Sequence, residues 1–251
     1  MSKPSRADDR PPKRRSGRSV VWLAAGVVLL TGALLALALG YLRTQAIETG
    51  QRATDSFAQI IEEQTARTLQ ATDQRLELAA VELARAQLTG TLDAESARAM
   101  LQKQIQSLPF VRAMWVLDAR GRIAYDTDTG NTGLDLSDRE YFRFHRDQPQ
   151  SGFHVGAPVR SRTTGDWLIS ASRPLPTDAG RGFQGIVVAA LQPIYFDQLW
   201  RSIDLGPDSS VAMIRHDGML MMRSPFNDAF MGKVHGELAL VRAALAGQSA
   251  G

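Results

Sequence analysis

The most distinctive pattern in the sequence is an uninterrupted apolar run near its N-terminus. Residues 19–42 contain no Asp, Glu, Lys or Arg. As an α-helix, residues 20–42 would extend roughly 34 Å, enough to cross a hydrocarbon core of about 30 Å. Trp22 and Tyr41 lie near the two ends, where aromatic rings favour the membrane interface. The pattern predicts a transmembrane helix over residues 20–42.

The charges before this run predict its orientation. The first 18 residues carry seven Lys and Arg side chains against Asp8 and Asp9. Basic flanks stay in the cytoplasm, so residues 1–19 are expected to be a cytoplasmic tail and residues after 43 periplasmic. A cleaved signal peptide is the alternative, because Ala36-Leu37-Ala38 resembles a cleavage site. Its apolar region would be shorter, roughly 7–15 residues, which favours a retained anchor in the bacterial inner membrane.

Beyond the anchor, apolar residues recur at helical spacing. Residues 44–88 contain no Pro, and the pattern predicts one long amphipathic helix that Gly90 ends. Asp93 is expected to cap a shorter helix running to Ser107, before Pro109. Residues 43–107 thus form a stalk helix and a short helix.

From Val111 the apolar period becomes that of β-strands. Ala119-Arg120-Gly121 is expected to be a hairpin turn, and Pro193 to open a helix ending near Ile203. The pattern predicts an α+β module over residues 108–204, with a five-stranded antiparallel sheet. The expected strands are 111–118, 122–127, 153–160, 166–173 and 183–192, with a short helix at 138–147.

Residues 205–251 resemble the start of that module. When Gly121 is aligned with Gly218, the apolar residues on both sides correspond, and Asp217-Gly218 is a strong hairpin signal. A helix is expected over residues 235–246. Three further strands would be needed to complete a second module, so we expect residues 205–251 to be its truncated start, in a fragment or truncated gene product.

Composition narrows the possible functions. The chain has no Cys and a net charge of +3, and the basic tail accounts for more than this excess. Disulfides and thiolate chemistry are therefore excluded, and no nucleic-acid-binding surface is expected on the folded part. His145 and His154 have no partner at metal-ligand spacing, and no nucleophile is visibly paired with a base. We expect no catalytic residues, metal or cofactor.

Three stretches make the chain similar to a known family. After the anchor, long helix and hairpin come DLSDREYFRFHRDQPQSGFHVGAPV, GDWLISASRPL and GFQGIVVAAL. Together they resemble the double Cache (PDC) sensor family, in which two PAS-like modules hang on one long helix. The resemblance implies a homodimeric input region of a histidine kinase, a GGDEF diguanylate cyclase or a chemoreceptor.

The resemblance also implies a binding residue. Amino-acid-binding members hold the ligand carboxylate with an Arg-x-Trp-Tyr stretch, which matches Arg139-Glu140-Tyr141-Phe142 here. A guanidinium can grip a carboxylate through two parallel hydrogen bonds, but an ion pair of Arg139 with Asp135 or Asp138 is equally compatible with the sequence. Tyr141 and Phe142 could line the pocket or belong to the core. The acidic residues that hold the amino group in those members are missing around 155–157 and 189–191, which favours a small carboxylate or another compact anion.

The strand at 166–173 supplies the other candidates, Trp167, Ser170, Ser172 and Arg173. By alternation Ser170 and Ser172 share one face with Leu168, whereas Trp167 and Arg173 share the other. Both faces cannot line one pocket, and the sequence leaves the choice open.

We therefore predict a transmembrane receptor that senses a small solute and signals to a cytoplasmic output domain, a histidine kinase or diguanylate cyclase. The alternative is a single-pass periplasmic structural or interaction protein without a ligand. An extracytoplasmic hydrolase is the weakest hypothesis, because no acid–base or metal set is visible.

Overall fold

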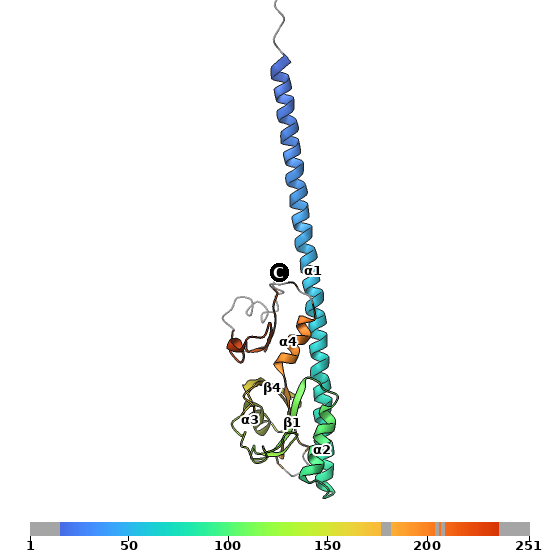
Figure 1. Ribbon diagram of the computed structural model, residues 1–251, viewed down its shortest axis with the longest axis vertical. Helices are drawn as coiled ribbons and strands as arrows, with labels where there is room; N and C mark the ends of the chain where they lie inside the picture. The colour runs from blue at the N-terminus through green and yellow to red at the C-terminus, as the bar shows by residue number, and fades with distance from the viewer. Residues whose placement is uncertain (1–15, 177–181, 204–205, 207–208, 236–251) are drawn as a thin grey trace, which may run out of the picture. The chain divides into compact units, whose positions relative to one another are not determined.

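A computed structural model describes residues 16–176, 182–203, 206 and 209–235. The chain divides into two units, Met1–Asp55 and Ser56–Gly251, and helix α1 (Ser16–Leu88) contributes to both (Figure 1). In the first unit, the side chains of residues 21–52 are exposed. By length and composition, α1 contains a segment that is apolar enough to cross a membrane.

The second unit begins with the rest of α1, which ends at Leu88 as the sequence predicts. Gly90 follows with a φ of 67°, a conformation that costs glycine little. Asp93 then caps α2 (Ala94–Ile105): its side chain accepts a hydrogen bond from the Ser96 backbone N–H, and the Ser96 side chain bonds the Asp93 backbone. The predicted cap is confirmed, and it fixes the start of α2.

The sheet of this unit has five strands in the order β2-β1-β5-β4-β3. All neighbouring pairs are antiparallel, so the predicted α+β fold class is confirmed. The strands are β1 (Val111–Asp118), β2 (Ile123–Asp126), β3 (His154–Arg160), β4 (Trp167–Pro174) and β5 (Gly185–Leu191). Helix α3 (Glu140–Asp147) precedes β3, and α4 (Pro193–Arg201) follows β5.

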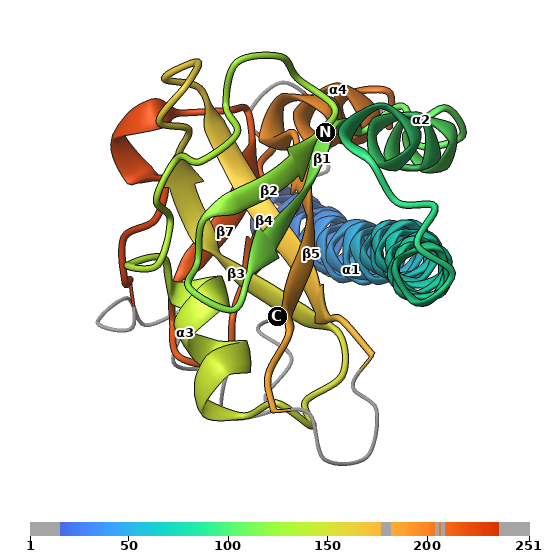
Figure 2. The same ribbon diagram turned by 90° about the horizontal axis from the view of Figure 1, so that it is seen from below.

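Each face of the sheet has its own apolar core, because successive strand residues point to opposite sides. In β5, Val187 and Ala189 face the core formed with α1, α2 and α4. Ile186 and Val188 face the second core, together with Tyr141 of α3. Figure 2 shows α1 and α3 on opposite sides of the sheet.

A second hairpin repeats the turn conformation and the strand register of the first. Strands β6 (Val211–Ile214) and β7 (Leu220–Ser224) turn at Gly218, whose φ of 83° is close to the 82° of Gly121. At the matching place each hairpin has an irregularity in its register. The corresponding partners are Val116↔Tyr125 and Leu117↔Ile123 in the first, and Met213↔Met222 and Ile214↔Leu220 in the second.

After each hairpin the chain folds back and forms a backbone hydrogen bond with the glycine of the turn, and this feature is also repeated. The backbone N–H of Leu136 donates to the Gly121 carbonyl at 2.8 Å, and that of His235 donates to the Gly218 carbonyl at 2.9 Å. The second return is two residues longer, and it includes the short helix η1 (Asp228–Phe230). The helix expected over 235–246 lies, apart from His235, outside the described residues.

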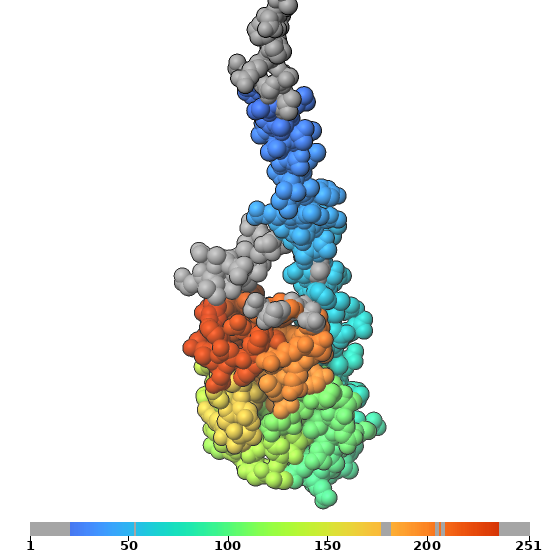
Figure 3. Space-filling model, turned by 45° about the horizontal axis from the view of Figure 1, so that its top comes forward, coloured from blue at the N-terminus to red at the C-terminus, as the bar shows by residue number. Residues whose placement is uncertain are grey.

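Residues 209–235, which we call the C-terminal hairpin segment, pack against the first module. Asp197 of α4 accepts the Phe226 backbone N–H at 2.9 Å, and Asp228 binds Arg160 of β3. In the space-filling view the segment forms one continuous surface with α4 (Figure 3). Contacts of the second hairpin therefore reach the elements that carry the candidate site.

Candidate ligand-binding site

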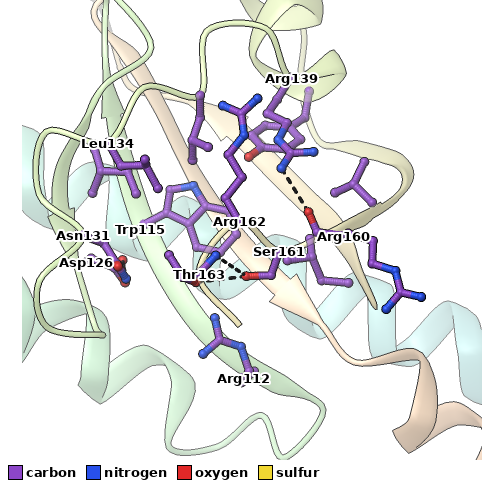
Figure 4. A pocket seen from close by; sticks show the side chains of 15 residues that line it. Arg112, Trp115, Asp126, Asn131, Leu134, Arg139, Arg160, Ser161, Arg162 and Thr163 are labelled. Atoms are coloured by element: carbon purple, nitrogen blue, oxygen red, sulfur yellow. Dashed lines mark hydrogen bonds between the residues drawn. The ribbon is translucent and has the colours of Figure 1, made fainter. Parts of the chain in front are cut away.

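A small cavity of about 40 Å³ lies on the α3 side of the sheet. The β1–β2 hairpin, the start of α3 and the turn between β3 and β4 surround it (Figure 4). Its size admits only a compact ligand, or part of one, without movement of the walls. The lining residues are Arg112, Trp115, Ile123, Asp126, Asn131, Leu134, Leu136, Arg139, Tyr141, Val159, Arg160, Ser161, Arg162, Thr163 and Leu168.

Arg139 occupies the N-cap position of α3 with an extended backbone, and its side chain does not cap the helix. This leaves the guanidinium directed across the cavity wall, where Nη2 donates to the Arg160 carbonyl oxygen at 3.0 Å. Within the described part of the chain, no carboxylate forms a salt bridge with Arg139. The pairing that the sequence left open belongs to Arg162, which donates to Asp138 Oδ2 and to the Asp135 carbonyl, each at 2.6 Å.

The other two arginines of the wall are also paired. Arg112 lies 2.7 Å from Asp128 Oδ2, and Arg160 donates to both carboxylate oxygens of Asp228. Among the described residues, Arg139 is thus the arginine of this cavity wall that forms no salt bridge, although its charge, like that of Arg162, helps to lower the pKa of Asp138.

Trp115 contributes a second donor group to the cavity wall. Its side chain is buried, lines the cavity and lies edge-on to Tyr141, with 6.4 Å between the ring centroids. The indole Nε1 makes no hydrogen bond of ordinary geometry to any described residue. Buried polar groups are almost always hydrogen-bonded, and a side-chain hydrogen bond with Trp115 partly opposes the rise in the Tyr141 pKa that burial causes, so the indole and this hydroxyl form one polar edge of the wall.

Asp126 contributes a buried carboxylate to the same cavity. Its oxygens accept the Asp128 backbone N–H and the Asn131 side-chain amide, each at 2.9 Å. Burial raises the pKa of Asp126, because the charged form loses solvation. Asp126 falls within the strand predicted at 122–127, but it was not among the predicted site residues. Its position opposite Trp115 depends on a hairpin register that short patterns leave undetermined.

Of the two predicted aromatic residues, one lines the cavity and the other packs in the core. Tyr141 lines the cavity, and burial raises the pKa of its hydroxyl, which keeps it neutral. Phe142 is not among the lining residues; it packs in the core with Phe183, with 5.7 Å between the ring centroids. Tyr141 remains a predicted ligand contact, and Phe142 is placed to support the wall from behind.

The four candidates on β4 lie on two different faces of the strand. Leu168 reaches the cavity, so the face that carries Ser170 and Ser172 is the one turned towards α3. Trp167 and Arg173 lie on the opposite face. Trp167 donates its indole N–H to Asp228, and Arg173 pairs with Asp73 of α1.

Ser170 and Ser172 lie beside the cavity and outside its lining. Ser172 Oγ is 3.0 Å from His145 Nε2, and Ser151 Oγ is 2.8 Å from His145 Nδ1. Burial is the main cause that lowers the pKa of His145 to about 4, so this imidazole is neutral at pH 7. Ser170 Oγ is buried and has no hydrogen-bond partner among the described residues.

The fold and this cavity together describe an α+β module in which a long helix covers one face of the sheet and a small cavity lies under the other. The chain belongs to the Cache domain family, whose model matches residues 40–247. Two solved structures illustrate the likeness. The extracellular domain of rpHK1S-Z16, assigned as a histidine kinase, is 29% identical with a TM-score of 0.66, and the match covers 77% of each chain.

The second structure is the ligand-binding domain of the Pseudomonas fluorescens chemoreceptor CtaA in complex with L-valine. It is 21% identical with a TM-score of 0.52, over 71% of this chain and 73% of that one, a likeness in fold alone. Among curated proteins, Sporulation kinase D of Bacillus subtilis (strain 168) is 25% identical over 133 residues. The match covers 53% of this chain and 25% of the kinase, so the chain spans about a quarter of that relative.

Proposed function

We propose that this chain is the extracytoplasmic sensing region of a transmembrane receptor, and that it binds a compact carboxylate or similar anion at Arg139. The observation that carries the proposal is that one cavity wall holds two donor groups: the Arg139 guanidinium, which forms no salt bridge with a described residue, and the buried Trp115 indole. An anion between them would receive a charge-assisted bidentate contact and a further hydrogen bond.

The carboxylate of Asp126 in the cavity wall affects which class of ligand is expected. Asp126 places a carboxylate where a ligand ammonium or hydroxyl group could donate. The CtaA domain was crystallised with L-valine, which carries both a carboxylate and an amine. We therefore retain a small carboxylate as the proposed ligand and make the amine an experimental variable.

The remaining parts of the proposal concern architecture. Residues 20–42 would cross the inner membrane, residues 1–19 would stay cytoplasmic, and a histidine kinase or diguanylate cyclase would receive the signal. The kinase relatives support this arrangement. Exposed Leu78, Val81 and Leu88 on α1 support a homodimer, because a second helix would remove this apolar surface from water. Chemical crosslinking at α1 in membranes tests the dimer.

The experiment is a titration of the full chain in detergent with L-valine and with isovalerate, the same carbon skeleton without the amine. Binding is followed by calorimetry and thermal shift in wild type, Arg139→Ala, Arg139→Lys and Arg143→Ala. Arg143 is the control, since it lies on the same helix with an exposed side chain. We expect Arg139→Ala to weaken binding about 10- to 100-fold, the loss of a charged hydrogen-bond pair, and Arg143→Ala to leave it unchanged.

Tighter binding of L-valine than isovalerate would give Asp126 the role of amine acceptor. Equal binding would leave the carboxylate as the recognised group. If Arg139→Ala folds and keeps the wild-type response to every bound carboxylate, the proposed site is wrong.

A further inference from the structure

Arg160 makes contacts in two opposite directions. Its carbonyl oxygen accepts the hydrogen bond from Arg139 Nη2 on the cavity side. Its guanidinium points away from the cavity (Figure 4) and donates to Asp228 Oδ1 and Oδ2 at 2.8 and 2.6 Å. The same guanidinium lies 4.8 Å from the centre of the Trp167 ring, whose N–H also donates to Asp228. One residue thus joins the candidate ligand-binding arginine to Asp228.

Asp228 belongs to the C-terminal hairpin segment, which fits closely against β3 at this point. A Cβ atom on Gly232 would lie 3.2 Å from the Pro158 carbonyl oxygen and 3.5 Å from the Trp167 ring. The backbone of the segment therefore rests directly on the strand that ends in Arg160. A shift of that strand end would displace the segment, because close-packed contacts transmit displacement.

A second contact starts from the residue next to Arg139. Glu140 Oε1 lies 3.6 Å from Arg215 Nη1 of the C-terminal hairpin segment. The same carboxylate accepts from His154 Nε2 at 3.1 Å and from the Ala157 backbone N–H at 3.3 Å. Arg215 is itself held by Asp217 at 2.8 Å. At the start of α3, the cavity-lining residue Arg139 is therefore followed directly by Glu140, which contacts the C-terminal hairpin segment.

We infer that Arg139 couples the cavity to the C-terminal hairpin segment. The coupling runs through the Arg160–Asp228 ion pair and the neighbouring Glu140–Arg215 ion pair. The nature of the bound anion rests on the proposed function; the coupling itself does not. An anion that Arg139 binds through Nη2 competes with the Arg160 carbonyl for that donor. The end of β3 then loses its hydrogen bond to Arg139, and the Arg160–Asp228 ion pair is weakened.

The expected size of the effect is modest. The Arg160 and Asp228 side chains are 53% and 58% exposed, and exposed ion pairs contribute little, equivalent to about two- to fivefold in a local opening equilibrium. Such a change is measurable as amide hydrogen exchange of β7 and η1. The β5 strand, which is buried throughout, serves as the internal reference for an intact fold.

The experiment compares the full chain in lipid nanodiscs with Arg139→Ala in three backgrounds: wild type, Asp228→Asn and Asp128→Asn. Asp128 is the matched control, because it also pairs with an arginine of the cavity wall, Arg112, but lies within the first module. We expect Arg139→Ala to raise exchange of β7 and η1 about two- to fivefold in the wild-type and Asp128→Asn backgrounds. In Asp228→Asn the same change should add much less.

Arg139→Lys replaces Arg139→Ala if β5 exchange reveals unfolding. The coupling is overturned if neither variant alters exchange of the segment, or if the change is as large in Asp228→Asn as in Asp128→Asn.

Adding L-valine or isovalerate separates this inference from the proposed function. If the carboxylate binds and segment exchange does not respond, the coupling fails while the binding site stands. If no carboxylate binds yet Arg139 variants alter the segment as expected, the proposed ligand class fails while the coupling stands.

Discussion

Arg173 on β4 and Asp73 on α1 form a two-point ion pair, with the Arg173 Nε and Nη2 atoms both donating to the carboxylate. Nη2 lies 3.2 Å from Asp73 Oδ2. The two side chains are only 25% and 28% exposed, so water competes weakly for the pair. The contact fastens the sheet to the long helix through residues 100 positions apart in the sequence.

Removal of this pair should destabilise the second unit. We expect Arg173→Ala to lower the free energy of unfolding by about 1–3 kcal/mol, because Asp73 would keep a partly buried charge without its partner. Urea denaturation measures the change. Arg67→Ala is the control, since its pair with Glu63 on the same helix is 68% and 61% exposed and is worth at most about 0.5 kcal/mol. Equal losses in the two variants would contradict this prediction.

His145 should make stability depend on pH. Its pKa is about 4 in the folded chain against an ordinary value of 6.5, so between these values the unfolded chain binds more protons. Stability therefore falls as the pH drops from 6.5 through 4, by about 3 kcal/mol in the limit. We expect the difference in unfolding free energy between wild type and His145→Gln to shrink over this window. A difference that stays constant from pH 7 to pH 4 would exclude this role.

Ser170 and Ser172 should respond in opposite ways to loss of the hydroxyl. Ser172→Ala leaves buried His145 without one of its partners and should cost about 1–2 kcal/mol. Ser170 Oγ has no partner among the described residues, so Ser170→Ala should be neutral or stabilising. Parallel thermal denaturation of the two variants tests this, and a larger loss for Ser170→Ala would indicate a polar partner at that site.

The orientation in the membrane is open to a direct test. A reporter that is active only in the periplasm, fused after Arg43, should be active, because the basic residues before the apolar run remain in the cytoplasm. Fusion within residues 1–19 should be inactive. A mature chain that begins after Ala38 would instead establish the signal-peptide alternative.

Much of the fold follows from short-range patterns. The strand predicted at 111–118 is observed as Val111–Asp118, because period-two alternation and the Gly121 turn act locally. Asp93, Gly90 and Pro193 likewise mark helix boundaries through their own backbone chemistry. The long helix to Leu88 needed only the absence of breakers and a helical apolar period.

The sequence by itself determined the uncharged apolar run and the order and type of the elements of the first module, since these depend on neighbours along the chain. Arg139 became a candidate through the resemblance to a known family. Tertiary structure alone decided which face of β4 turns to the cavity, that Asp126 lies in the wall beside Trp115, and that Asp228 reaches Arg160. Asp228 and Arg160 lie 68 residues apart, and the orientation of β4 depends on strands and helices far along the chain. Asp126 and Trp115 are closer in sequence, but their pairing depends on a hairpin register that packing of the whole unit selects.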